Sequence, residues 1–153
     1  MRVLVLNGPN LNLLGSREPG IYGTGTLADI EAALSDRART LEVEITCHQS
    51  NSEGELVDLI QAAAGSTEGI VINPGGYSHT SVAIRDALAA VGLPAVEVHL
   101  SNPSAREWFR HVDLVAGACR GVIAGFGQLG YLMALERVVE MSRPSGSGSV
   151  GGA

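Results

Sequence analysis

Five short apolar segments, each followed by a stretch with helical spacing, constrain the fold of this chain most strongly. The apolar segments cover residues 3–6, 42–47, 70–72, 95–99 and 121–124. A continuous β-branched run such as Ile70-Val71-Ile72 is typical of a strand buried on both faces of a sheet. Strands that alternate with helices predict parallel pairing through crossover connections. We therefore expect an α/β protein with a doubly wound five-stranded parallel sheet of flavodoxin-like order.

The intervening segments carry helix start signals. Thr26 with Asp29, and Ser52 with Glu55, have the spacing of capping boxes ahead of apolar residues at helical intervals. Later helices are expected over residues 82–91, 106–110 and 129–139. One domain is expected over residues 1–141, with a loop at about 15–25 that acts as a lid, and the Ser/Gly/Pro-rich residues 142–153 are expected to be a disordered tail.

Composition excludes several classes of function. The 153 residues fit one domain, and their net charge of -6 argues against a nucleic-acid surface. All ten basic residues are arginine, so the chain has no lysine for a Schiff base or for a phosphate-binding P-loop. No GxxxxGK motif is present, and the His and Cys spacing suggests no metal site.

The sequence shows no pattern typical of a signal peptide or of a transmembrane helix. No apolar stretch approaches the length of a membrane span, and the first residues open directly into a strand. The two cysteines, Cys47 and Cys119, lie in apolar contexts that favour free buried thiols over a disulfide. These features predict a cytoplasmic protein.

A long loop follows the first expected strand. The strand breaks at Asn7-Gly8-Pro9-Asn10, and no helical pattern resumes before residue 26. Connections of this length are uncommon unless they bind ligands or cover a site. The loop carries Arg17 and Tyr22, and a guanidinium close to a phenol could lower the phenol pKa enough to make it a usable base. The alternative is an arginine in solvent and a tyrosine ring packed beneath the loop.

Polar residues gather where three expected strands end. Because ligands of open parallel sheets bind at the carboxyl ends of the strands, these residues predict a site there. Within residues 95–99, alternation places Glu97 and His99 on the same face. Glu97 is expected to accept a hydrogen bond from one ring nitrogen of His99, leaving the other for proton transfer. The alternative is a structural histidine. The residues are Asn7, Asn10, Asn73, His79, Glu97, His99 and Ser101.

Two arginines predict an anion site nearby. Arg106 and Arg110 are four residues apart and would share a helical face, where like charges repel unless an anion or an acidic group separates them. Ser101 follows a strand end and could cradle a carboxylate with backbone N–H groups. The alternatives are a solvated charged face that includes Glu107, and a serine that caps the next turn. Arg85 and Asp86 are expected on a solvated face.

Several sequence blocks resemble type II 3-dehydroquinate dehydratase, the cofactor-free dehydroquinase of the shikimate pathway. The resemblance covers nearly all of the chain before residue 142. The blocks are Asn7-Gly8-Pro9-Asn10-Leu11-Asn12-Leu13-Leu14-Gly15, Arg17-Glu18-Pro19, Tyr22-Gly23, Gln49-Ser50-Asn51-Ser52-Glu53-Gly54, Asn73-Pro74-Gly75-Gly76-Tyr77-Ser78-His79-Thr80-Ser81, Glu97-Val98-His99-Leu100-Ser101-Asn102 and Gly121-Val122-Ile123-Ala124-Gly125.

The resemblance implies a hydro-lyase that converts 3-dehydroquinate to 3-dehydroshikimate by anti elimination through an enolate. In that family Tyr22 would remove the C2 proton with help from Arg17, and His99, oriented by Glu97, would protonate the departing C1 hydroxyl. Asn10 would hold a water that stabilises the enolate. The substrate contacts implied are Asn73, His79, Leu100, Ser101, Arg106 and Arg110.

The resemblance also implies an assembly. Asp86 would reach the site of a neighbouring subunit in a homododecamer built from trimers. The chain departs from the family pattern at Pro103-Ser104 and at Cys47-His48, which bears on local rigidity and on a subunit contact. A function of a different class also fits the residues: a non-catalytic flavodoxin-like module that binds a small anion or nucleotide at the same edge.

Overall fold

The protein forms a five-stranded parallel sheet covered by helices on both faces. The computed structural model describes residues 1–16, 18–22 and 25–144, and for residues 19 and 22 it describes only the backbone. The strands are β1 (Arg2–Asn7), β2 (Glu44–Gln49), β3 (Gly69–Asn73), β4 (Ala95–His99) and β5 (Gly121–Ala124). They pair in parallel in the order β2-β1-β3-β4-β5. This confirms the flavodoxin-like order expected from the sequence.

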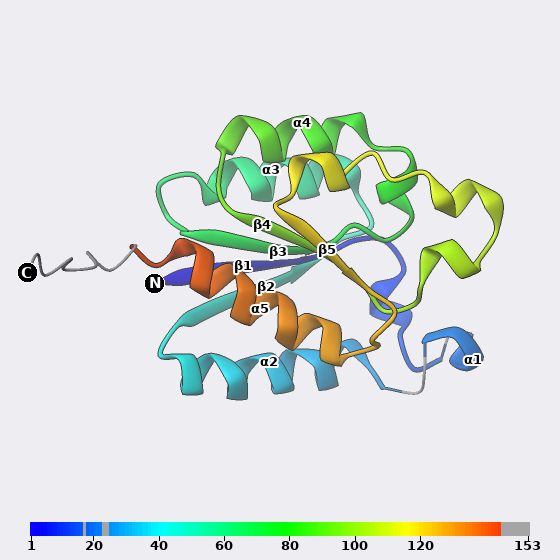
Figure 1. Ribbon diagram of the computed structural model, residues 1–153, viewed down its shortest axis with the longest axis horizontal. Coiled ribbons are helices and arrows are strands. Elements are labelled where there is room, and N and C mark those ends of the chain that lie inside the picture. Colours follow the sequence, from blue (N-terminus) through cyan, green and yellow to red (C-terminus); the bar gives the residue numbers. More distant parts are fainter. Residues whose placement is uncertain (17, 23–24, 145–153) are drawn as a thin grey trace, which may run out of the picture.

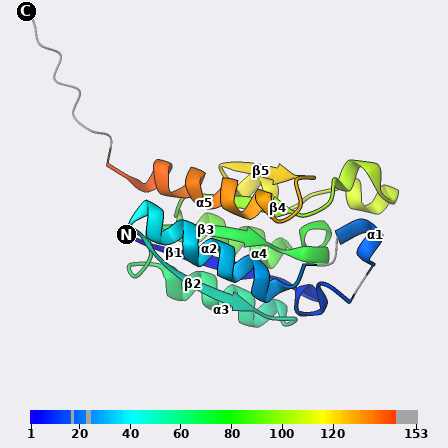
Figure 2. The ribbon, with the colours of Figure 1, turned by 90° about the horizontal axis from the view of Figure 1, so that it is seen from below.

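The helices divide between the two faces of the sheet (Figures 1 and 2). The helices α2 (Leu27–Leu41) and α5 (Leu129–Ser142) cover one face, and α3 (Glu53–Ala63) and α4 (Val82–Val91) cover the other. The short α1 (Pro19–Tyr22) lies beyond the carboxyl ends of the strands (Figure 1). Five 3-10 turns complete the described fold, at Leu11–Leu13, Gly75–His79, Pro103–Ala105, Trp108–His111 and Ala116–Ala118.

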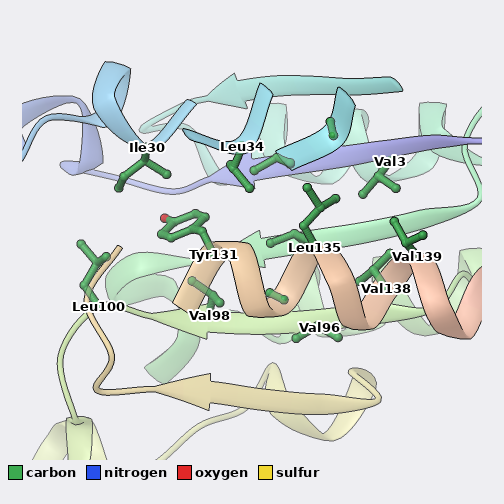
Figure 3. Packing of buried hydrophobic residues seen from close by; sticks show 14 of the residues in the cluster. Val3, Ile30, Leu34, Val96, Val98, Leu100, Tyr131, Leu135, Val138 and Val139 are labelled. Carbon is green, nitrogen blue, oxygen red and sulfur yellow. The ribbon is translucent and has the colours of Figure 1, made fainter. Parts of the chain in front are cut away.

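Alternating residues of the central strands supply two cores. In β1, Val3 and Val5 pack with α2 and α5, whereas Leu4 and Leu6 pack with α3 and α4. Figure 3 shows the first core, in which Tyr131 of α5 is the largest fully buried side chain. Because β1, β3 and β4 are buried on both faces, their carboxyl ends are held rigidly between two packed layers.

Two local expectations about helix and strand starts need refinement. Thr26 and Asp29 form the expected capping box at the start of α2. Ser52 accepts a hydrogen bond from the Glu55 backbone, but the Glu55 carboxylate bonds the Ser50 hydroxyl instead of completing a box. β2 begins at Glu44 instead of residue 42, because Glu42 takes a left-handed backbone conformation that ends α2.

The predicted helix over residues 106–110 is wrong. Two separate 3-10 turns form here, at Pro103–Ala105 and Trp108–His111. Arg106 lies between them and has an extended backbone with φ of -113°. The first turn is capped by the Asn102 side chain and has Pro103 at its start, so it closes within three residues. Arg106 and Arg110 therefore do not share a helical face.

Three further expectations concern the whole chain. The helix α5 includes Ser142, and residues 145–153 of the expected tail lie outside the described residues. Cys47 and Cys119 are free thiols, each half-buried. None of the helices described is long and apolar enough to cross a membrane.

Candidate active site

A cavity of about 230 Å³ opens at the carboxyl ends of β1, β3 and β4. The topology brings the segments that follow these three strands to one end of the sheet, at the right of Figure 1. Most of the predicted site residues line this cavity, and they lie at or after the ends of these three strands. They are Asn10, Asn73, His79, His99, Leu100, Ser101, Arg106 and Arg110.

The loop after β1 is held in place by backbone contacts and amide side chains. The Gly8 N–H donates to the Asn73 carbonyl at 2.8 Å, and a Cβ at Gly8 would lie 2.3 Å from the Pro74 oxygen. Only glycine permits this approach. Asn10 has a left-handed backbone, and its N–H donates to the Asn51 side-chain oxygen at 3.0 Å. The amide of Asn51 thus fixes the position of Asn10.

A buried hydroxyl connects the ends of β1 and β3. The Tyr131 hydroxyl donates to Asn7 Oδ1 at 2.7 Å and accepts from Asn73 Nδ2 at 2.9 Å. Asn73 Oδ1 accepts from the Gly75 N–H, so both ends of this amide are held. Burial raises the pKa of Tyr131, so its phenol stays neutral. Sequence reasoning missed Tyr131, because it lies on an apolar helix face far along the chain.

Tyr131→Phe is expected to destabilise the protein by about 1–3 kcal/mol, because two buried amides lose a partner that water cannot replace. It should also raise KM for the substrate, since Asn73 lines the cavity. Denaturant unfolding and steady-state kinetics would measure both effects. The control is Tyr77→Phe, which removes a hydroxyl that donates to the Asn51 carbonyl at the surface. Equal losses in the two variants would refute the special role of the buried hydroxyl.

The expected pairing of Glu97 with His99 is present. His99 Nε2 lies 2.7 Å from Glu97 Oε1, and Glu97 is fully buried while His99 is 9% exposed. Burial raises the pKa of Glu97 above its usual range, although the bond from His99 opposes this shift. The carboxylate holds one ring nitrogen of His99, so the other nitrogen, Nδ1, is available to a ligand in the cavity.

A second carboxylate, Asp113, also lies close to His99. Asp113 Oδ2 is 3.8 Å from His99 Nε2. Although burial disfavours the imidazolium, the carboxylates of Asp113 and Glu97 outweigh it and raise the pKa of His99 to about 9. Sequence reasoning missed Asp113, whose only local signal is its position before the turn at Ala116–Ala118.

Among the described residues, one group of His, Cys, Asp or Glu side chains has the spacing of a metal site. It consists of Glu97, His99 and Asp113, whose ligand atoms lie within 4.8 Å of one another. A metal ion at this point would need the lone pair of His99 Nε2. That nitrogen carries a proton when it donates its hydrogen bond to Glu97, so the lone pair is not available. The geometry is that of an acid–base cluster.

The two predicted arginines face the cavity as neighbours of one carboxylate. Arg110 Nε donates to Glu107 Oε2 at 2.7 Å, and Arg106 Nε lies 3.8 Å from the same oxygen. Their side chains are only 13% and 20% exposed, so neither forms the solvated face considered as the alternative. The backbone N–H of Glu107 itself and the nearby guanidinium of Arg110 lower the pKa of the Glu107 carboxyl. The two arginines thus share the Glu107 carboxylate at the edge of the cavity.

Three further lining residues are held by backbone groups. His79 Nδ1 lies 2.7 Å from the Val112 carbonyl, which orients its ring. Glycine N–H groups of the segment after β5 donate to the carbonyls of His99 and Leu100, at 3.2 and 3.0 Å. Ser101 follows directly and lines the cavity. The wall formed by residues 99–101 is therefore supported by β5 and its loop.

Three predicted residues are not brought to the cavity by the described chain. Asp86 lies on the exposed side of α4 and does not line the cavity. Arg17 lies outside the described residues, as does the side chain of Tyr22, whose backbone belongs to α1. Arg85, expected in solvent, instead donates to the Leu114 carbonyl at 2.9 Å.

The fold and this cavity define a flavodoxin-like α/β protein with a buried imidazole–carboxylate cluster at the carboxyl end of its sheet. The family model for dehydroquinase class II matches residues 1–139. The chain is 59% identical over 143 residues to a 3-dehydroquinate dehydratase of Synechococcus sp. (strain CC9605), covering 94% of this chain and 98% of that one. A 3-dehydroquinate dehydratase of Desulforudis audaxviator is 56% identical over 141 residues, covering 92% and 94%.

Solved structures agree with this likeness. The type II dehydroquinase of Butyrivibrio crossotus superposes with a TM-score of 0.89 at 46% identity, covering 90% of this chain and 97% of that one. That of Propionibacterium acnes has a TM-score of 0.87 at 45% identity, covering 91% and 96%. The chain belongs to the class II dehydroquinase family, a family of hydro-lyases.

Proposed function

We propose that the protein dehydrates 3-dehydroquinate to 3-dehydroshikimate in the shikimate pathway, by anti elimination through an enolate and without a cofactor. The observation that carries this proposal is a buried histidine, His99, paired with Glu97 at the wall of a cavity that two arginines also line. An anionic substrate would enter such a cavity, and an imidazolium beside it can donate a proton.

The substrate carboxylate would bind at the end of β3 and after β4. Asn73, the Ser101 hydroxyl and the backbone at Leu100 and Ser101 are the groups proposed to hold it. The support is that Asn73 is pre-oriented by Tyr131 and Gly75 before any ligand arrives. His79 and Arg110 would contact the ring hydroxyls, and Arg106 would help to close the lid. Pre-oriented contacts reduce the entropy lost when the substrate binds.

Proton removal from C2 is assigned to Tyr22, with Arg17 favouring its phenolate. The support is that the two other tyrosines of the chain are committed elsewhere. Tyr131 is buried beneath the cavity with its pKa raised, and the Tyr77 hydroxyl donates to the Asn51 carbonyl at 2.7 Å. Asn10 would hold the water that stabilises the negative charge on the enolate oxygen.

The second proton transfer is assigned to His99. With Nε2 bonded to Glu97, Nδ1 would protonate the C1 hydroxyl, which leaves as water while the enolate electrons form the new double bond. The His99 pKa of about 9 keeps the ring protonated at neutral pH. This acid form is lost as the pH rises through about 9, so kcat should fall there.

We propose further that residues 15–25 act as the lid and that the subunits assemble as a homododecamer built from trimers, in which Asp86 reaches a neighbouring site. Large apolar side chains at the surface support this assembly, because contact with other subunits would bury them. Trp108 is 79% exposed and Phe126 is 59% exposed. Light scattering would measure the mass. The single domain over residues 1–141, the disordered tail and the cytoplasmic location expected from the sequence stay predictions.

The function is tested by ultraviolet absorbance after 3-dehydroquinate is added to the purified protein. We expect the absorbance of a conjugated enone to grow with time in proportion to enzyme concentration, because dehydration conjugates the ketone with the new double bond. Heat-denatured protein is the control. Binding of 3-dehydroquinate without any growth of absorbance would instead favour the non-catalytic anion-binding module.

A further inference from the structure

The loop that carries Asp113 is fixed against the wall of the cavity by three hydrogen bonds. The Leu114 N–H donates to the Ser78 carbonyl at 2.7 Å, and Arg85 donates to the Leu114 carbonyl at 2.9 Å. His79 Nδ1 bonds the Val112 carbonyl on the other side of Asp113. The loop is therefore anchored to the segment between β3 and α4 at both neighbours of Asp113.

The Asp113 carboxylate uses its two oxygens for different purposes. Oδ1 accepts from the backbone N–H groups of Val115 and Ala116 at 3.0 and 2.9 Å. Oδ2 is left to face His99 Nε2 at 3.8 Å. Although burial opposes it, the His99 ring and the Ala116 N–H hold the pKa of Asp113 below its usual range. The side chain is 27% exposed, so its negative charge also keeps some solvation.

Glu97 is less suited to carry a full negative charge. It is fully buried, and its Oε2 has no hydrogen-bond partner in the described part of the chain. A buried carboxylate with an unpaired oxygen is costly to ionise. Glu97 orients the ring through its 2.7 Å bond. Asp113, beside the same nitrogen, has one oxygen held by two backbone N–H groups and is partly solvated, so it carries a negative charge at lower cost.

We propose that Asp113 is a positioning residue whose negative charge, supplied beside Nε2, keeps His99 protonated for the dehydration. Glu97 sets the ring orientation and also favours the imidazolium, and Asp113 adds the charge of a second carboxylate beside the same nitrogen. The inference rests on the proposed function, in which His99 acts as the acid.

Other charged or titratable groups of the described chain lie around this cluster, and none of them is changed in the variants that follow. Arg106, Arg110 and His79 line the cavity, and Cys119 is close enough for the Glu97 and Asp113 charges to raise its pKa.

The test is the pH dependence of kcat in Asp113→Asn. The amide oxygen can still accept from Val115 and Ala116, so the loop keeps its cap while the charge is lost. Removing an opposite charge from this largely buried contact, 3.8 Å from Nε2, should lower the His99 pKa by about one unit. For an acid with a pKa near 9, kcat would fall about fivefold at pH 9 and less than about twofold at pH 7.

A merely structural role would lower kcat equally at both pH values, and that result, or no change at either, would overturn the proposal. If Asp113→Asn does not fold, Asp113→Ser offers another capping oxygen without charge. Asp29→Asn is the matched control, because Asp29 also bonds backbone N–H at a helix start but lies on α2. It should leave the pH profile unchanged.

A second readout separates this inference from the proposed function. The chain has four histidines, so ¹⁵N-histidine resonances can be assigned to His99 by comparison with His99→Gln. The titration midpoint of His99 should fall by about one pH unit in Asp113→Asn even if 3-dehydroquinate is not turned over. An unshifted midpoint would refute the role of Asp113, whereas absent turnover with a shifted midpoint would refute only the proposed reaction.

Discussion

His99→Gln is expected to lower kcat for 3-dehydroquinate by about 10²- to 10⁴-fold, the usual contribution of a positioned general acid. Glutamine fills similar space and can still hydrogen-bond Glu97, but it cannot release a proton to the leaving hydroxyl. Affinity for a non-reacting substrate analogue should change only a few-fold, because Asn73 and Ser101 still line the cavity. Steady-state kinetics and calorimetric titration measure the two quantities.

The matched control is His48→Gln, which changes an exposed histidine on β2 that does not line the cavity. It should retain near-normal kcat. If His99→Gln also kept at least a tenth of the parent kcat, His99 would not be the acid, and the buried pair with Glu97 would be a structural one.

Tyr22→Phe is expected to lower kcat by a similar factor of about 10²–10⁴ while analogue binding is retained. Phenylalanine keeps the ring but cannot accept the C2 proton, and the remaining tyrosines are bonded elsewhere. Exchange of the C2 proton with deuterated solvent should be lost together with turnover, since both need the base. Nuclear magnetic resonance of the substrate measures this exchange.

Tyr77→Phe is the control for Tyr22→Phe, because Tyr77 does not line the cavity and its hydroxyl bonds a backbone carbonyl. It should exchange the C2 proton at nearly the parent rate. Exchange that persists in Tyr22→Phe at the parent rate would remove Tyr22 from the role of base.

Local patterns predicted most of the architecture because the elements depend on local rules. The continuous apolar run of β3 is typical of a doubly buried strand, which is what it forms, and Thr26 with Asp29 predicted a capping box that is present. The segment around Arg106 was mispredicted because two short 3-10 turns have no periodic signature. Its fold depends on the Asn102 cap and on contacts outside the segment.

The sequence by itself determined the parallel sheet, the edge at which the site lies and the Glu97–His99 pair, because alternation within one strand fixes which residues share a face. Only the tertiary structure decided which distant residues join them. Tyr131 bridges Asn7 and Asn73 from the last helix, and Asp113 reaches His99 from a loop anchored on Ser78. Such contacts follow from how the layers pack, and no spacing along the chain encodes them.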